Sequence, residues 1–388
     1  MLRALCLAFA VLVMPLSYAS GDPVADPNTN AALSYWQAFA TLPHLTDAEQ
    51  NKLTSECLTM PLDAPTRELV DKADYALQMM HRGAALPQCD WGVGSEEGIY
   101  ARLPHVPAAR VLCSLACLRA RMRFEEGRNA LAVNDILAGM ALGRHVSQDG
   151  LMIVLLVGYN IEHRMSDTLA LYLPKLDAKE IQDVRKRLAT LPAGGSAAKS
   201  LSIEEKFGLD WLIRTVKDTK DNDKLLAQLS PLFMREGPGR STPQEQLAKA
   251  REFIQACGGT GDGVVRFAEK VRPSYAFMAA KLDLPPDEFE KVFQLEEKKQ
   301  ADNPVFQVIF PSLRKIRLQQ ARTDVRRSLV LAALAVQLDG PGAQKNHPDP
   351  VIGEPFEYVA FEGGFQLRSK LKGQDNQPLS ITIGRRGK

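Results

Sequence analysis

The sequence carries almost no net charge. Its 48 lysines and arginines face 46 aspartates and glutamates, which leaves a formal charge of +2 over 388 residues. A protein that binds nucleic acid through the phosphate backbone concentrates basic side chains on one surface. The near-balance of charge gives no sign of such an excess, so we expect no nucleic-acid partner.

Long apolar runs are also missing. A membrane-spanning helix needs roughly 18 or more apolar residues in succession, and the N-terminal run at 4–16 is shorter. It follows the positive charge of Arg3 and precedes a small-x-small triplet at 17–19, the pattern of a secretory signal peptide. We expect a signal peptide at 1–19, cleavage after Ala19, and a flexible leader at 20–29. The mature chain would then lie in the periplasm or outside the cell, without a transmembrane span. The alternative is an uncleaved membrane anchor.

Cysteine is scarce, and its number becomes odd once Cys6 is removed with the signal. The remaining cysteines are Cys57, Cys89, Cys113, Cys117 and Cys257. An odd number leaves at least one thiol free or bonded to another molecule. Cys57 and Cys89 lie near the ends of two polar connections, so we predict a disulfide between them. Cys113 and Cys117 share one helical face without a histidine pair nearby, and we interpret them as packing residues rather than metal ligands.

Complete catalytic and cofactor motifs are missing as well. The sequence has no Gly-x-Ser-x-Gly elbow and no His-Glu-x-x-His pair. The glycine-rich loop at 258–263 lacks the Lys-Ser/Thr of a phosphate loop, and the acidic segment at 218–223 lacks the glycine and terminal glutamate of a calcium loop. Glu162 and His163 would form an acid–base pair only through tertiary contacts. We therefore predict no catalytic residue, no cofactor and no metal site.

Helical periodicity is what the sequence does have, from residue 30 to about 338. A Gly-, Ala- and Ser-rich linker at 192–200 separates an N-terminal helical domain at 30–191 from a second helical region at 201–311. One helix start is clearly marked, because Thr242 precedes a proline and Glu245 follows at the spacing of a capping box.

The last region, 312–388, changes character. A long helix precedes three short stretches of alternating apolar residues, which predict a three-stranded antiparallel meander covered by that helix. The expected fold class is mainly α, a helical bundle or a set of hairpins with a small C-terminal α+β unit.

Basic residues recur along the expected long helix. They are Arg314, Lys315, Arg317, Arg322, Arg326 and Arg327. One interpretation is a face that meets an anionic surface or partner. The other is a solvated face that borders an apolar stripe.

Some segments resemble known proteins. The hairpin expected at 108–145 resembles a tetratricopeptide repeat unit. The segment at 349–358 resembles the head domain of type II secretion pseudopilins, because it follows a long helix and precedes a hairpin. The chain lacks the N-terminal cleavage motif of those proteins. The resemblance therefore does not imply filament assembly. The whole chain resembles a group of uncharacterised exported bacterial helical proteins, through 30–43, 89–92, 103–105 leading into 108–145, 303–304 and 350–358.

These observations predict an exported interaction or scaffold protein whose partners are proteins. One alternative is an extracytoplasmic hydrolase with a site assembled from distant residues. Another is an accessory subunit of an envelope secretion or pilus-like system. A solvent-reaching hollow in which ionisable groups from distant segments converge would favour an enzyme.

Overall fold

The computed structural model describes most of the chain after the N-terminal segment. The described residues are 29–94, 96–217, 219–234, 241–373 and 375–385. The expected signal peptide at 1–19 lies outside them, as does the leader at 20–29 except for its last residue.

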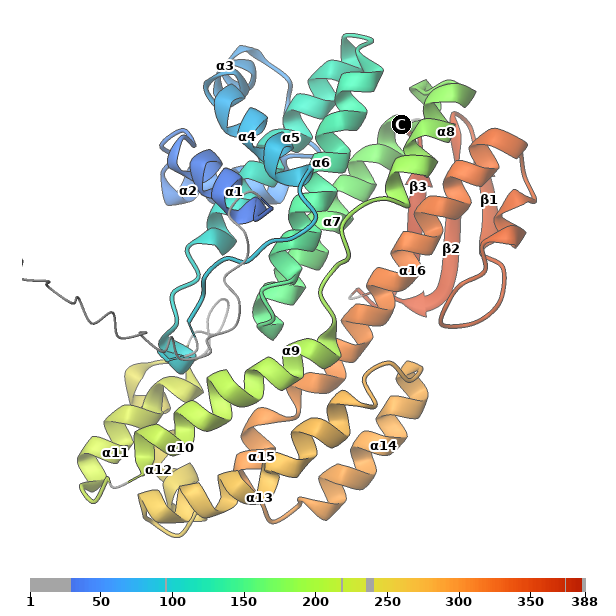
Figure 1. Cartoon of the computed structure of the whole chain (residues 1–388). Helices are drawn as coiled ribbons and strands as arrows, with labels where there is room; N and C mark the ends of the chain where they lie inside the picture. Colours follow the sequence, from blue (N-terminus) through green and yellow to red (C-terminus); the bar gives the residue numbers. More distant parts are fainter. Residues whose placement is uncertain (1–28, 95, 218, 235–240, 374, 386–388) are drawn as a thin grey trace, which may run out of the picture.

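The first helices form a bundle that we call the large lobe. Figure 1 shows α5, α6 and α7 side by side, with the shorter helices α1 to α4 against one flank, and α8 packs against α6 and α16 (Ser312–Asp339). Their bounds are α1 Ala31–Ala40, α2 Asp47–Glu56, α3 Ala64–Lys72, α4 Asp74–Ala84, α5 His105–Glu125, α6 Asn129–Ser147, α7 Met152–Tyr172 and α8 Ala178–Leu188. The hairpin expected at 108–145 corresponds to α5 and α6.

The following helices form the small lobe. They are α9 Ala197–Glu204, α10 Trp211–Val216, α11 Asn222–Leu229, α12 Pro243–Ala256, α13 Gly261–Ala279, α14 Pro286–Lys299 and α15 Pro304–Ile309. The predicted capping box is confirmed at the start of α12, because Thr242 Oγ1 accepts from Glu245 N and the Glu245 carboxylate accepts from Thr242 N. The linker is shorter than expected, because α9 already begins at Ala197.

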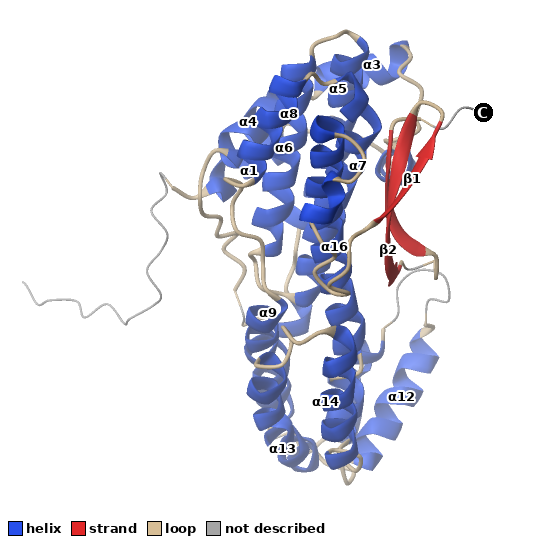
Figure 2. Cartoon of the chain, turned by 90° about the vertical axis from the view of Figure 1, so that its right-hand side faces the viewer, coloured by secondary structure: helices blue, strands red, loops and turns tan. Residues whose placement is uncertain are grey.

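The C-terminal region consists of α16 Ser312–Asp339 and a sheet of β1 Glu357–Phe361, β2 Gly364–Lys372 and β3 Pro378–Ile383. The strands pair antiparallel in the order β1-β2-β3. Leu367 of β2 and Ile381 of β3 are paired and buried, and Figure 2 shows the sheet on one side of the helices. The fold class is thus confirmed: the chain is mainly α-helical with a small antiparallel sheet at its C-terminal end.

Two hydrophobic cores lie in the described residues, and α7 and α16 contribute to both. Leu155 of α7 and Leu313 of α16 belong to the core of the small lobe, whereas Ile161 and Leu329 belong to that of the large lobe. The sheet has no separate core, because its apolar face joins the core of the large lobe. Within the described residues, no helix has both the length and the apolar character needed to cross a bilayer.

Glycines allow α6 and α7 to cross closely. A Cβ atom at Gly158 of α7 would lie 2.4 Å from the carbonyl oxygen of Gly143 on α6, and one at Gly143 would lie 2.8 Å from the carbonyl oxygen of Gly158. Real Cβ atoms do not approach an oxygen this closely, so both positions exclude a side chain. The crossing fixes the distance between the two most central helices of the large lobe.

Candidate functional site

An apolar groove of about 350 Å³ lies where the two lobes meet. It is formed by the first turns of α7 and α16 together with α9, α13 and α15. Its lining residues are Met152, Ile153, Leu156, Leu201, Glu204, Tyr275, Ile309, Phe310, Ser312, Leu313, Lys315 and Ile316. An apolar pocket with a few polar groups at a lobe junction is a common form of ligand or partner site.

The groove exists because the start of α7 is apolar on every side. Leu155 points into the core of the small lobe, while Ile153 is left 58% exposed. The backbone N–H groups in the first turn of a helix have no acceptor within that helix. Glu204 provides one for α7, because its carboxylate accepts a hydrogen bond from Met152 N at 2.9 Å. Burial raises the pKa of Glu204. The only basic residue in the lining, Lys315, is exposed at the rim.

A second, more polar cavity of about 320 Å³ lies between α2, α5 and α7. Exposed Ser55 of α2 forms part of its lining, so the cavity reaches solvent there. The lining residues are Thr54, Ser55, Cys57, Leu58, Arg110, Cys113, Asn160, Ile161, His163, Arg164 and Asp167. These residues come from segments far apart in the chain. The hollow is therefore the kind of arrangement that we stated would favour an enzyme.

Cys57 lies in the wall of this thiol cavity, as we name it, at the C-terminal end of α2. Arg164 Nη1 donates to the Cys57 sulfur at 3.1 Å and to Ser114 Oγ at 3.0 Å. The Cys117 sulfur lies 3.7 Å from the Cys57 carbonyl oxygen and 3.2 Å from Thr168 Oγ1. Two thiols thus lie together beside one guanidinium group.

The three thiols around the cavity differ in acidity. The hydrogen bond from Cys117 and the charge of Arg164 outweigh burial, and together they lower the pKa of Cys57 to about 6. The same hydrogen bond and burial raise the pKa of Cys117 well above its ordinary value. Burial raises the pKa of Cys113 to about 12. The two pKa values move in opposite directions, so the surroundings favour the thiolate form at Cys57 over that at Cys117.

A neighbouring cavity of about 360 Å³ shares Asn160 and His163 with the thiol cavity and extends to α16 and the turn between β2 and β3. His163 Nε2 lies 3.0 Å from Thr323 Oγ1. Burial, followed by the charge of Arg326, lowers the pKa of His163 to about 3, so its ring is neutral at pH 7. Glu162 is directed elsewhere, and the adjacent Glu162 and His163 do not form an acid–base pair.

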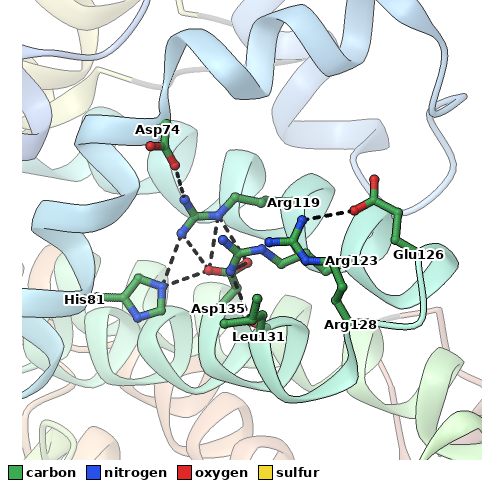
Figure 3. Close-up of polar contacts among 8 residues, drawn as sticks. All are labelled: Asp74, His81, Arg119, Arg123, Glu126, Arg128, Leu131 and Asp135. Carbon is green, nitrogen blue, oxygen red and sulfur yellow. Dashed lines mark hydrogen bonds and ion pairs between the residues drawn. The ribbon is translucent and has the colours of Figure 1, made fainter.

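The most extensive buried ion-pair network lies between α4, α5 and α6. Asp135 is fully buried and accepts from Arg119, which approaches through Nε and Nη2, and from Arg123 at 2.7 Å (Figure 3). His81 Nε2 lies 2.8 Å from the same carboxylate, and Asp74 pairs with the far side of Arg119. Every group has a partner within the network, so we interpret it as structural rather than as a reactive centre.

The basic stretch of α16 does not form one free face. Arg327 makes a two-point ion pair with Glu162 of α7, and Arg326 pairs with Asp167 one turn further along. These side chains hold α16 against α7 across the interior of the large lobe. The charges of Arg326 and Arg327 are therefore neutralised by ion pairs within the chain.

Other members of the stretch point in different directions. Arg314 pairs with Glu290 and Glu297 of α14, and buried Arg317 donates to the Leu284 carbonyl oxygen. Arg322 donates to the backbone carbonyls of Lys372, the last residue of β2, and of Gly373. Of the two interpretations of Arg314, Lys315, Arg317, Arg322, Arg326 and Arg327, the structure speaks against a single anionic-partner face, because acceptors within the chain on several sides of the helix bind all but Lys315.

The disulfide predicted between Cys57 and Cys89 is also corrected. The five cysteines in the described residues are all free. Cys57 packs against Cys117 of α5, whereas Cys89 lies in the loop before α5, where burial and the charge of Asp149 raise its pKa. The sequence placed both cysteines at the ends of polar connections, but the helices direct the two thiols into different neighbourhoods.

Three of the segments that carry the resemblance to exported helical proteins, 30–43, 89–92 and 103–105, come together in an aromatic cluster. Asn30 exchanges two hydrogen bonds of 2.9 Å with the backbone of Asp90. Trp91 stacks on His105 at 4.7 Å and on Tyr35 at 5.6 Å. All three rings are buried. These residues fasten the first helix to the bundle, and their role is packing.

His145 in this cluster predicts a pH dependence of stability. Its ring lies 2.9 Å from the Tyr35 hydroxyl and is buried, and burial lowers its pKa from 6.5 to about 4. Between these values the unfolded chain binds a proton that the folded chain does not, so stability is lost as pH falls through this window. From pH 7 to pH 5 the loss should be about 2 kcal/mol. Urea unfolding of wild type and His145→Gln at both pH values checks this, and a gap that is equal at both pH values would contradict it.

Comparison of the chain with protein-family models, with curated proteins and with solved structures finds no match. Within the described residues, no group of three or more His, Cys, Asp or Glu side chains is placed to hold a metal ion. The groove and the thiol cavity are therefore interpreted from their own geometry.

Proposed function

We propose that this protein is an exported interaction protein that captures a helical segment of a partner protein in the apolar groove. The groove lies at the junction of the lobes and leaves Ile153 more than half exposed. When a partner covers an exposed apolar side chain at the edge of a groove, the removal of that side chain from water stabilises the complex. This observation carries the proposal.

The occupant that fits is an amphipathic helix with an acidic side chain beside its apolar face. Grooves of this kind receive apolar side chains at helical spacing. Lys315 at the rim supplies the only positive charge in the lining, and Ser312 is exposed beside it. Glu204, the only acidic residue there, is half-buried and already bound to the backbone of α7. Charge complementarity therefore favours a partner that is acidic at this edge.

Binding can be measured with a designed probe, a fluorescent amphipathic peptide of leucine and glutamate. We expect it to bind at least about tenfold more tightly than a peptide in which lysine replaces glutamate, a difference of about 1.4 kcal/mol. Ile153→Asp should weaken binding by a similar factor, and Lys315→Glu should reverse the charge preference. Fluorescence anisotropy gives each affinity.

Leu295→Asp is the matched control, because Leu295 is 70% exposed on α14 and does not line the groove. It should leave the affinity unchanged. Equal weakening by both aspartate variants would contradict a specific groove. Binding of a small apolar dye without binding of either peptide would contradict a protein partner.

A second candidate is an accessory subunit of an envelope secretion or pilus-like system. The order of a long helix followed by a three-stranded sheet at 312–383 favours it. Asp349 anchors the connecting segment by accepting from the backbone of Val351 and Ile352. Co-purification of the full chain with secretion components that is unchanged in Ile153→Asp would support this candidate over the first.

A further inference from the structure

The thiol cavity is independent of the groove and has a chemistry of its own. Cys57 is the only one of its three thiols whose surroundings favour the thiolate form. Arg164 supplies the positive charge at 3.1 Å, and Ser114 supplies a hydroxyl group beside it. Cys117 contacts Cys57 from the neighbouring helix α5. A nucleophile and a charged stabilising group therefore line one solvent-reaching hollow, and the second thiol, Cys117, contacts Cys57 from outside the lining.

We propose that Cys57 and Cys117 form a peroxide-reducing thiol pair, in which Cys57 attacks a small hydroperoxide and Cys117 then closes a disulfide onto it.

The first step forms a bond between the Cys57 sulfur and the terminal oxygen of the hydroperoxide and breaks the O–O bond. The leaving oxygen departs as an alkoxide or hydroxide and takes a proton from solvent, while Arg164 stabilises its developing charge. Sulfur is oxidised by two electrons to a sulfenic acid, and the peroxide is reduced by two electrons to an alcohol or water.

In the second step the Cys117 sulfur attacks the Cys57 sulfur. The S–O bond of the sulfenic acid breaks, and its hydroxyl group leaves with the Cys117 proton as water. Two thiols and one hydroperoxide thus yield one disulfide, one alcohol and one water. A dithiol reductant would return the pair to its reduced form by exchange, becoming a disulfide itself.

The cavity favours a small oxidant over a bulky disulfide. Its volume is about 320 Å³, and Cys57 is only 1% exposed, so a protein disulfide would not reach the sulfur. Arg110 and Arg164 outnumber Asp167 among the charged lining residues, so the hollow carries a net positive charge that stabilises the negative charge developing on the leaving oxygen. Cys113 lines the same cavity and serves as an internal comparison, because its thiol stays protonated.

Wild-type protein alone tests the nucleophile. Hydrogen peroxide is added to the reduced full chain between pH 5 and pH 9, and the modification of each cysteine is followed by mass spectrometry with a 1,3-dicarbonyl trap for sulfenic acid. We expect Cys57 to react first, with a half-maximal rate near pH 6. At pH 7 the thiolate fraction of Cys57 should be about 30-fold that of an ordinary free cysteine, so Cys57 should be the faster of the two to react. A half-maximal rate above pH 8, or reaction no faster than after unfolding, would overturn the proposal.

Variants test the partners. Cys117→Ser should accumulate the sulfenic acid at Cys57, where wild type forms a Cys57–Cys117 disulfide. Arg164→Met should move the half-maximal rate towards higher pH and slow the reaction at pH 7 at least about tenfold, and Arg164→Lys should restore part of both. Cys257→Ser is the control, because Cys257 is buried in the small lobe and burial raises its pKa to about 12. A disulfide from Cys57 to any other cysteine, or an unchanged pH profile in Arg164→Met, would overturn the proposed pair.

Discussion

Replacing Asp135 by asparagine is expected to lower the free energy of unfolding by about 3–5 kcal/mol. The carboxylate is fully buried and accepts from both Arg119 and Arg123. An amide has one acceptor oxygen and no charge, so it would leave the buried Arg119 with only the exposed carboxylate of Asp74 and would take from Arg123 its carboxylate partner. Such uncompensated charges cost far more than the loss of a surface ion pair. Urea or guanidinium unfolding followed by circular dichroism measures the change.

Two further variants separate this effect from a general sensitivity to charge. Glu126→Gln removes a carboxylate that pairs with Arg67 at the surface, where the side chains are 39% and 44% exposed, and should change stability by no more than about 0.5–1 kcal/mol. The double variant Arg119→Met with Asp135→Leu replaces the central pair by apolar groups and should recover much of the loss. A small effect of Asp135→Asn, equal to that of Glu126→Gln, would show that the network is not coupled.

Gly158→Ala is the second substitution with a large expected effect. The new Cβ atom would lie 2.4 Å from the Gly143 carbonyl oxygen and 2.8 Å from the Ser147 backbone nitrogen. Because both neighbours are backbone atoms of α6, the helices must move apart. We expect a loss of about 3 kcal/mol, at the upper end of the usual cost of overpacking. Thermal and denaturant unfolding provide the measurement.

Gly208→Ala is the matched control for this substitution. A Cβ atom at Gly208 has nothing within 4 Å, and the residue lies in the helical stretch between α9 and α10. Alanine favours helix over glycine by roughly 1 kcal/mol, so the control should be neutral or stabilising. If both substitutions stabilised the protein, the close crossing of α6 and α7 would be wrong.

Local features of the fold could be predicted from the sequence because their causes are local. The capping residues Thr242 and Glu245 lie three residues apart, and the alternation of Leu379, Ile381 and Ile383 marks one face of a strand. Each signal needs only a few neighbouring residues. Helix starts and the C-terminal sheet followed from them.

The sites could not be predicted because their residues are brought together by packing. Arg327 reaches Glu162 across 165 positions of sequence, so the basic stretch of α16 looked unpaired. Cys57 and Arg164 are 107 positions apart, and no spacing rule joins them. The pattern of Cys113 and Cys117 gave a shared helical face, but it carried no information on which thiol lies opposite.

The sharing of α16 between the two cores has a consequence for how the protein is made. The large lobe draws its helices from residues 31–188, but its core also contains side chains of 325–336 and of the strands up to Ile383. During synthesis from the N-terminus, the large lobe therefore keeps apolar surface exposed to solvent until the C-terminal residues have been made. Premature termination of synthesis would release a truncated chain that is prone to aggregate. Chaperones that hold unfolded chains would bind the apolar surface that this chain exposes.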